Sequence, residues 1–150
     1  MKLVQKAIEN TLHIADMVEN IDIGLYQDNQ MPIINIPDEF ENGDKYVEYL
    51  IWEGFEKRFK NFPEDKKEKR RQRIKDELPV IEALHYSEYF IMLRMLTNAA
   101  KAKGIPLGYS RGSGGNCLCL YCLGVTQIDS VRWNLDFSRF ANLGRKSMAD

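Results

Sequence analysis

The chain has 150 residues, of which 44% are apolar and 29% charged, with a formal net charge of −1. This composition is typical of one globular domain, and the near-neutral charge excludes binding to nucleic acid through the overall field of the chain. No apolar stretch approaches the ~20 residues of a membrane span and the N-terminus lacks a signal-peptide layout, so we expect a cytoplasmic protein with no membrane partner.

The first third of the chain predicts two helices separated by an extended connector. Residues 2–20 predict an amphipathic helix, because apolar side chains recur at helical spacing. A short strand is expected at 21–26, and prolines and a glycine predict an irregular connector over 28–44. Residues 44–60 predict a second helix, although Gly54 weakens this prediction. The apolar stripe of the first helix comprises Leu3, Ala7, Ile8, Leu12, Ala15 and Val18.

A third helix is predicted to begin at Pro63, because proline suits a first helical turn and two acidic residues follow it. Its middle, residues 66–75, contains seven lysines and arginines. This run indicates either a phosphate-contacting face or a solvated face with charges at i,i+4 spacing, and the second interpretation is favoured. Pro79 is expected to kink or end the helix.

The next segment predicts a buried helix and then a loop. Ser87 is a suitable N-cap for a helix that runs to Lys103 and ends at Gly104. Apolar side chains surround most of this helix, which predicts that it is buried. Residues 105–108 are a candidate strand, and residues 112–123 predict a tight apolar helix.

The loop between these last two elements reads Gly-Tyr-Ser-Arg-Gly-Ser-Gly-Gly from residue 108 to residue 115. Because the first amides of a helix lack intrahelical partners, a helix that begins at Ser113 predicts an anion site. Gly112 lets a phosphate approach the backbone, and Arg111 adds a charge. The motif is neither a Walker loop nor a dinucleotide fingerprint, and the alternative is a flexible turn before a close-packed helix.

Three cysteines follow the loop, and their odd number argues against a disulfide framework. A zinc site needs four ligands as a rule, and His13 and His85 lie far away in the sequence. Small thiols in a closely packed helix are therefore favoured over a metal site. The cysteines are Cys117, Cys119 and Cys122.

Several motifs match one family in order and spacing along nearly the whole chain. Residues 108–126 resemble the family's Gly-Pro-Gly-Arg-Gly-Ser-Gly-Ala-Gly-Ser-Leu-Val-Ala-Tyr segment. Residues 135–150 resemble its Leu-Phe-Glu-Arg-Phe-Leu-Asn-Pro-Glu-Arg-Val-Ser-Met-Pro-Asp-x-Asp, and residues 7–11, 78–90 and 104–106 also match. These motifs are similar to those of the C-family bacterial replicative DNA polymerases, the alpha subunit of DNA polymerase III.

The resemblance implies a palm similar to that of polymerase-beta-type nucleotidyltransferases, and hence an α+β fold, mostly helical, with a few short strands. It implies that Gly112 and Ser113 contact the triphosphate of an incoming deoxynucleoside triphosphate. It further implies that Arg139 neutralises this triphosphate, with Arg111 and Arg145 as weaker candidates.

Asp150 matches the family's first metal-binding aspartate, which implies a catalytic role in a site for two Mg²⁺ ions. Aspartates at i and i+2 of a strand share one face, and residues 1–150 include only the first of that pair. The expectation is a single partial domain, residues 1–150, with a helical portion at 1–104 and a nucleotide-binding portion with the start of a catalytic strand at 105–150. Such a fragment of a DNA-directed DNA polymerase is expected to be inactive alone.

The partners implied are a deoxynucleoside triphosphate, the remaining polymerase half in cis or in trans and, in the complete enzyme only, a DNA primer-template. Departures from the family motif indicate a divergent lineage, such as a phage enzyme in an infected bacterial cell. The departing residues are Tyr109, Ser110, Cys117, Gly144 and Ala149. The alternative function is a non-catalytic helical module that holds a phosphorylated ligand through Ser113 and Arg139.

Overall fold

Helices make up all the regular secondary structure of residues 2–18 and 33–144, which are the residues that this computed structural model describes. The predicted α+β fold is therefore wrong for this part of the chain. The elements are α1 (Lys2–Asp16), α2 (Gly43–Phe59), α3 (Glu64–Ala83), α4 (Ser87–Ala102), the 3-10 helix η1 (Gly112–Asn116), α5 (Leu118–Cys122) and the 3-10 helix η2 (Phe137–Arg139).

The absence of strands from the described residues has a simple physical cause. Residues 105–108 do have an irregular, non-helical backbone, but a strand exists only when its amides and carbonyls pair with a neighbour. Within the described ranges no second strand offers that pairing. The strands predicted at 21–26 and 145–150 lie outside the described residues.

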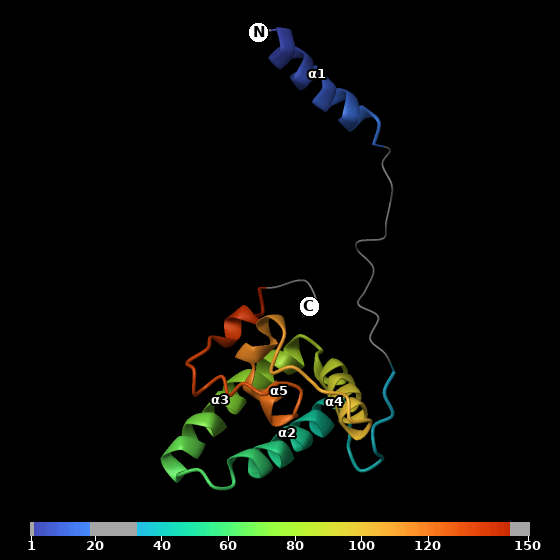
Figure 1. Ribbon diagram of the computed structural model, residues 1–150. Helices are drawn as coiled ribbons and strands as arrows, with labels where there is room; N and C mark the ends of the chain where they lie inside the picture. Colours follow the sequence, from blue (N-terminus) through green and yellow to red (C-terminus); the bar gives the residue numbers. More distant parts are fainter. Residues whose placement is uncertain (1, 19–32, 145–150) are drawn as a thin grey trace.

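The helix predicted over 44–60 is confirmed as α2, and its start is explained by a side-chain cap. Oδ1 of Asn42 accepts a hydrogen bond of 3.0 Å from the amide of Lys45, which satisfies one of the free amides of the first turn. The buried face of α2 contacts α4 and α5 (Figure 1). Its fully or almost fully buried apolar side chains are Val47, Leu50, Ile51, Phe55 and Phe59.

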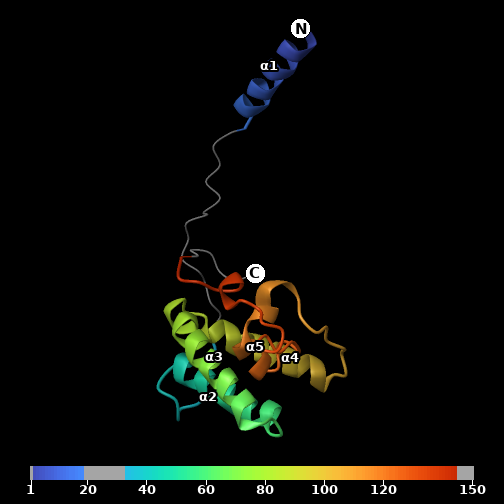
Figure 2. The same ribbon diagram turned by 90° about the vertical axis from the view of Figure 1, so that its left-hand side faces the viewer.

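Helix α3 begins after Pro63, as predicted, but it does not end at Pro79. The helix continues to Ala83, so the loss of one backbone donor at the proline is tolerated within it. Ile74 and Ile81 are buried and join the core formed with α2 and α5. Figure 2 shows α3 and α2 running side by side across one face of the helical core.

Helix α4 differs from its prediction at the N-terminus and in burial. Ser87 is the first helical residue rather than the N-cap, and its hydroxyl donates to the carboxylate of Asp44 on α2. Only one side of α4 is in the core, because Met95 and Leu96 are each 59% exposed. The end of the helix is as predicted, with Gly104 in a left-handed conformation at φ 69°.

Helix α1 is amphipathic as predicted, but its apolar stripe does not enter the core. Leu3, Ile8 and Leu12 are 85%, 53% and 63% exposed. In Figures 1 and 2 α1 lies apart from α2–α5.

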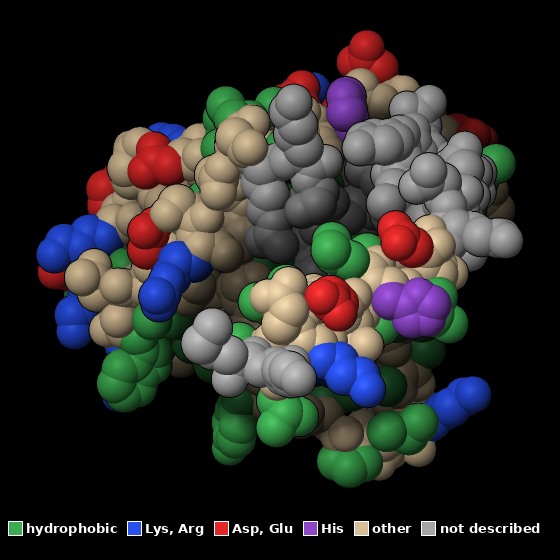
Figure 3. Space-filling model, turned by 90° about the horizontal axis from the view of Figure 1, so that it is seen from above, with side chains coloured by type: hydrophobic (Ala, Val, Ile, Leu, Met, Phe, Trp, Pro, Cys, Tyr) green, Lys and Arg blue, Asp and Glu red, His purple; other side chains and the backbone are tan. Residues whose placement is uncertain are grey.

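Seen from above, acidic and basic side chains are interspersed on the surface of the protein (Figure 3). Among the described residues no helix has the length and apolarity that crossing a bilayer requires.

Candidate functional site

The glycine-rich loop borders a hollow of about 580 Å³, a volume within the range of small-ligand sites. Three of the predicted phosphate-binding residues, Arg111, Gly112 and Ser113, line this hollow. An apolar wall of the hollow comes from α4, from α5 and from residues of the segments between and after these helices. This wall includes Tyr89, Leu93, Leu107, Leu120, Val125 and Phe140.

Two further residues that line the hollow, Ser110 and Thr126, have buried hydroxyls with no hydrogen-bond partner among the described residues. Thr126 is only 4% exposed. The amide of Gln127 donates to the carbonyl of Tyr109 at 2.7 Å, which ties the segment carrying Thr126 to the loop carrying Ser110. A buried hydroxyl without a partner is costly, so both hydroxyls are candidates for a further hydrogen bond.

The prediction of one continuous helix over 112–123 is wrong, because the backbone is interrupted between the loop and α5. Gly112 has φ 62°, a left-handed conformation that favours glycine, and begins the 3-10 helix η1. Cys117 is then extended, with φ −98° and ψ 118°, before α5 begins at Leu118. Ser113 therefore lies in a 3-10 turn and not at the N-terminus of an α-helix.

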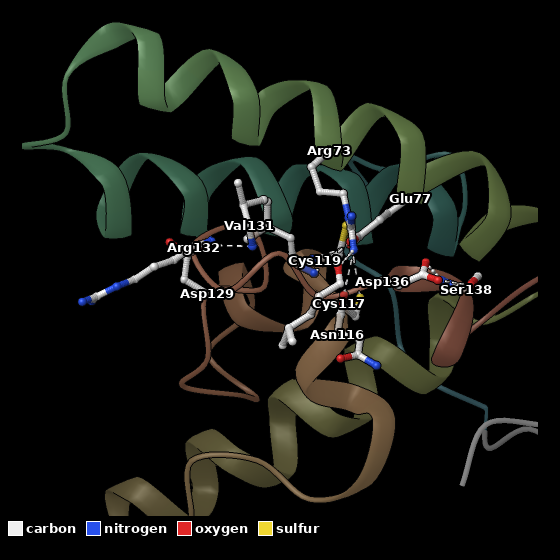
Figure 4. A network of polar contacts seen from close by, with 12 residues as sticks. Arg73, Glu77, Asn116, Cys117, Cys119, Asp129, Val131, Arg132, Asp136 and Ser138 are labelled. Carbon is white, nitrogen blue, oxygen red and sulfur yellow. Dashed lines mark hydrogen bonds and ion pairs between the residues drawn. The ribbon is translucent and has the colours of Figure 1, made fainter.

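The free amides at the start of α5 are bound by Glu77, a fully buried carboxylate on α3 (Figure 4). Oε1 accepts from the amide of Leu118 at 3.0 Å, and Oε2 accepts from the amide of Cys119 at 2.9 Å. The thiol of Cys117 donates to Oε2 at 3.3 Å. The carboxylate thus replaces the anion that the sequence predicted at this helix terminus, and these amides are not available to a phosphate.

Arg73, one turn earlier on α3, extends this network to two other segments. Its Nε donates to Oε1 of Glu77 at 2.6 Å. Its Nη2 donates to the carbonyl of Asn116 at 3.1 Å and to the carbonyl of Leu135 at 2.9 Å. Asn116 ends η1, and Leu135 lies shortly before η2. The sequence gives no signal for either role, because apart from the local Arg73–Glu77 pair the partners lie 40 or more positions apart in the chain.

Arg139 lies in η2, is exposed, and does not line the hollow. However, η1 and η2 contact one another, so the segments that carry Ser113 and Arg139 are neighbours. Asp136 caps η2 by accepting from the amide and the hydroxyl of Ser138 at 2.9 and 2.7 Å. These bonds, that of the hydroxyl foremost, lower the pKa of Asp136. Arg145 and Asp150 lie outside the described residues.

The basic run on α3 is divided between ion pairs and exposed lysines. Arg70 is 5% exposed, and its Nε donates at 3.0 Å to Oδ2 of Asp129, whose other oxygen accepts from the amides of Val131 and Arg132. Arg71 pairs with two glutamates at the start of α3 and, like Arg70 and Arg73, has acidic partners. The three arginines therefore serve ion pairs within the fold.

All three cysteines are free and buried. Ligand atoms of Cys117, Cys119 and Glu77 lie within 4.8 Å of one another, which makes this a geometric candidate for a metal. The oxygens of Glu77 are already bound by Arg73 and by backbone amides, however. Burial raises the pKa of Cys117 to about 11 and that of Cys119 well above its ordinary value, so both are neutral thiols at pH 7. This arrangement favours packed thiols over thiolate ligands.

Comparison with known proteins gives one consistent result. The family described as the bacterial DNA polymerase III alpha NTPase domain matches residues 45–150. The DNA polymerase III subunit alpha of Campylobacter jejuni is 34% identical over 165 residues, which cover 98% of this chain and 14% of that protein. The corresponding subunits of Borreliella burgdorferi and Aquifex aeolicus are 35% and 30% identical, over 97% of this chain and 12% and 13% of their own lengths.

Proposed function

This chain belongs to the bacterial DNA polymerase III alpha family, and from that membership we propose that it supplies part of the incoming-nucleotide site of a DNA-directed DNA polymerase in DNA replication. The chain spans about one seventh of the length of the Campylobacter relative. Polymerisation on a DNA primer-template is therefore proposed for a complete enzyme, in which the remaining polymerase sequence acts in cis or in trans.

The observation that carries this proposal is the hollow beside the glycine-rich loop. It is lined by Arg111 and Ser113 together with Ser110 and Thr126, whose hydroxyls have no partner among the described residues. A triphosphate is an acceptor of hydrogen bonds and carries several negative charges, so it suits a guanidinium and hydroxyl donors. Gly112 leaves the loop open on this side, because a Cβ built there would meet no atom within 4 Å.

Arg139 is proposed to neutralise the triphosphate from the adjoining segment. The contact between η1 and η2 supports this role, since it places the Arg139 segment beside the loop. Its guanidinium is exposed and is in none of the ion pairs of the described residues. Arg145 is a further candidate from the sequence alone.

Magnesium binding is proposed at Asp150, on the family motif alone. None of the described residues that line the hollow is acidic, so the hollow by itself does not fit a magnesium ion, which prefers carboxylate oxygens. Any carboxylate ligand would have to come from residues outside this lining. The same observation favours a second candidate function, a module that binds a phosphorylated ligand without metal and without catalysis.

Isothermal titration with dATP, in the presence and in the absence of Mg²⁺, tests these proposals. Ser113→Ala and Arg139→Met should each weaken binding by roughly tenfold, since each removes a hydrogen bond to a charged phosphate. Arg132→Met is a matched control, because Arg132 is exposed and lies outside the lining of the hollow. Equal effects of all three variants would contradict the site. Tight binding that does not depend on Mg²⁺ would favour the non-catalytic module.

A further inference from the structure

We propose that the Arg73–Glu77 pair of α3 is a positioning device that sets the glycine-rich loop and the Arg139 segment in register with one another. The inference rests on the proposed function for its binding readout. Neither residue lines the hollow. Any effect of these two residues on a ligand must therefore pass through the segments that they hold.

The contacts of Glu77 fix where α5 begins. Its carboxylate reaches from α3 to the amides of Leu118 and Cys119, 41 and 42 positions along the chain. The residue before α5, Cys117, provides no side-chain cap of its own. Because η1 ends at Asn116, one residue earlier, the start of α5 also determines where the loop can lie. Glu77 is thus the cap that α5 lacks in its own sequence.

The contacts of Arg73 join the loop to the second segment. One guanidinium nitrogen, Nη2, donates both to the carbonyl of Asn116 and to the carbonyl of Leu135. Asn116 ends the 3-10 helix that contains Ser113, and Leu135 lies four residues before Arg139 in the sequence. The same guanidinium lies 5.9 Å from the ring of Phe137 in η2. Two segments distant in the sequence thereby share one donor atom.

Glu77 and Arg73 also constrain one another. Nε of Arg73 donates to Oε1 of Glu77, which turns the guanidinium so that Nη2 points to the two carbonyls (Figure 4). An ion pair that includes a buried carboxylate is a weak source of stability on its own, since desolvation offsets its attraction. The pair matters here for the geometry, because it holds both segments in fixed positions relative to the rigid helix α3.

A second ion pair, between Arg70 of α3 and Asp129, provides a control. Arg70 and Asp129 are both buried and bonded, but Asp129 holds the turn at residues 129–132 and neither residue lines the hollow. Loss of either pair is expected to destabilise the fold. Only loss of the Arg73–Glu77 pair should also change the loop.

The first measurement is amide hydrogen exchange of the full chain without ligand. Glu77→Gln should accelerate exchange in residues 112–122 and 135–140 together, while the turn at 129–132 stays protected. Asp129→Asn should give the reverse pattern. Arg73→Lys, which keeps a positive charge beside Glu77, is a milder variant that should loosen residues 116 and 135. A uniform increase throughout the chain, or an increase in only one of the two segments, would overturn the proposal.

The second measurement is the affinity for Mg²⁺ and dATP, at a temperature where all variants are folded by circular dichroism. Glu77→Gln should weaken binding by about tenfold or more, because small displacements of binding groups are costly. Asp129→Asn should change the affinity by less than about twofold. Equal losses in the two variants would reduce Glu77 to an ordinary stabilising residue and overturn the proposal. If the parent chain binds no dATP, the proposed function fails, and the exchange pattern alone decides on the positioning role.

Discussion

Gly54 on α2 and Cys122 at the end of α5 are packed backbone against backbone. A Cβ built on Gly54 would lie 2.0 Å from the carbonyl oxygen of Cys122, a distance that no side chain can adopt. The glycine that weakened the helix prediction is therefore the residue that lets α5 contact α2. Short α5 has little stability of its own, so this close contact helps to fix its position.

Gly54→Ala is expected to destabilise the fold for this reason. The clash involves backbone atoms that cannot rotate away, and such overpacking costs about 3 kcal/mol. Alanine returns only about 1 kcal/mol through its better helix propensity. Urea unfolding monitored by circular dichroism measures the difference. Gly108→Ala is the matched control, since a Cβ there meets no atom within 4 Å. Equal stability of the two variants would show that α5 does not sit against Gly54.

Thr126→Val should raise stability and lower affinity at the same time. Its hydroxyl is buried without a partner among the described residues, so removing it should stabilise the ligand-free protein by about 1 kcal/mol. The same change should weaken dATP binding roughly fivefold if the ligand supplies the missing bond. Ser130→Ala is the control, because Ser130 is equally unpartnered but does not line the hollow. Loss of affinity in both variants would argue against a specific contact at Thr126.

The free energy of unfolding should fall as the pH rises above the ordinary pKa of a cysteine thiol. Burial raises the pKa of Cys117 to about 11, whereas in the unfolded chain the thiol titrates near pH 8.5. Between these two values the unfolded state loses the proton and the folded state keeps it. The free energy of unfolding is therefore not reduced by this thiol below about pH 8.5. It falls by about 1.4 kcal/mol per pH unit as the pH rises from there toward 11.

Cys117→Ser isolates this effect. Serine retains a hydroxyl that can donate to Glu77 but does not ionise in this range, so the decline of stability between pH 8 and pH 10 should be shallower than in the parent. Urea unfolding at several pH values measures the slope. The other two cysteines, also buried, supply the decline that remains. Identical slopes in parent and variant would mean that Cys117 is not protected by burial.

Substitution of Leu12 should have little effect on the stability of the core. Its side chain is 63% exposed on α1, so Leu12→Gln is expected to change the free energy of unfolding by less than about 0.5 kcal/mol. Ile74→Ala, at a fully buried position of α3, should cost about 3 kcal/mol. A large loss in Leu12→Gln, measured by urea unfolding, would place the apolar stripe of α1 in a core after all.

The elements that sequence predicts best here are those with local causes. The helix at α2 follows from its apolar positions, and the end of α4 follows from Gly104, because both signals lie within a few residues of their effect. The family was also identified correctly from short ordered motifs. The roles of Ser113, Arg139 and Asp150 stay predictions, since they depend on a ligand and on residues beyond those described.

What tertiary structure alone decides is how these local pieces satisfy one another. The break at Cys117 and the start of α5 depend on Glu77, a carboxylate 40 positions away that no periodicity connects to the loop. The apolar stripe of α1 is exposed, because a helix can be amphipathic without a partner on its apolar face. Sequence by itself determined the helices α1 to α4, the loop motif and the family, because each depends on residues that are neighbours in the chain. The strand-free fold of the described residues, the Arg70–Asp129 pair, the bonds of Arg73 and Glu77 to distant segments, and the hollow arise from long-range contacts, which exist only once the chain has folded.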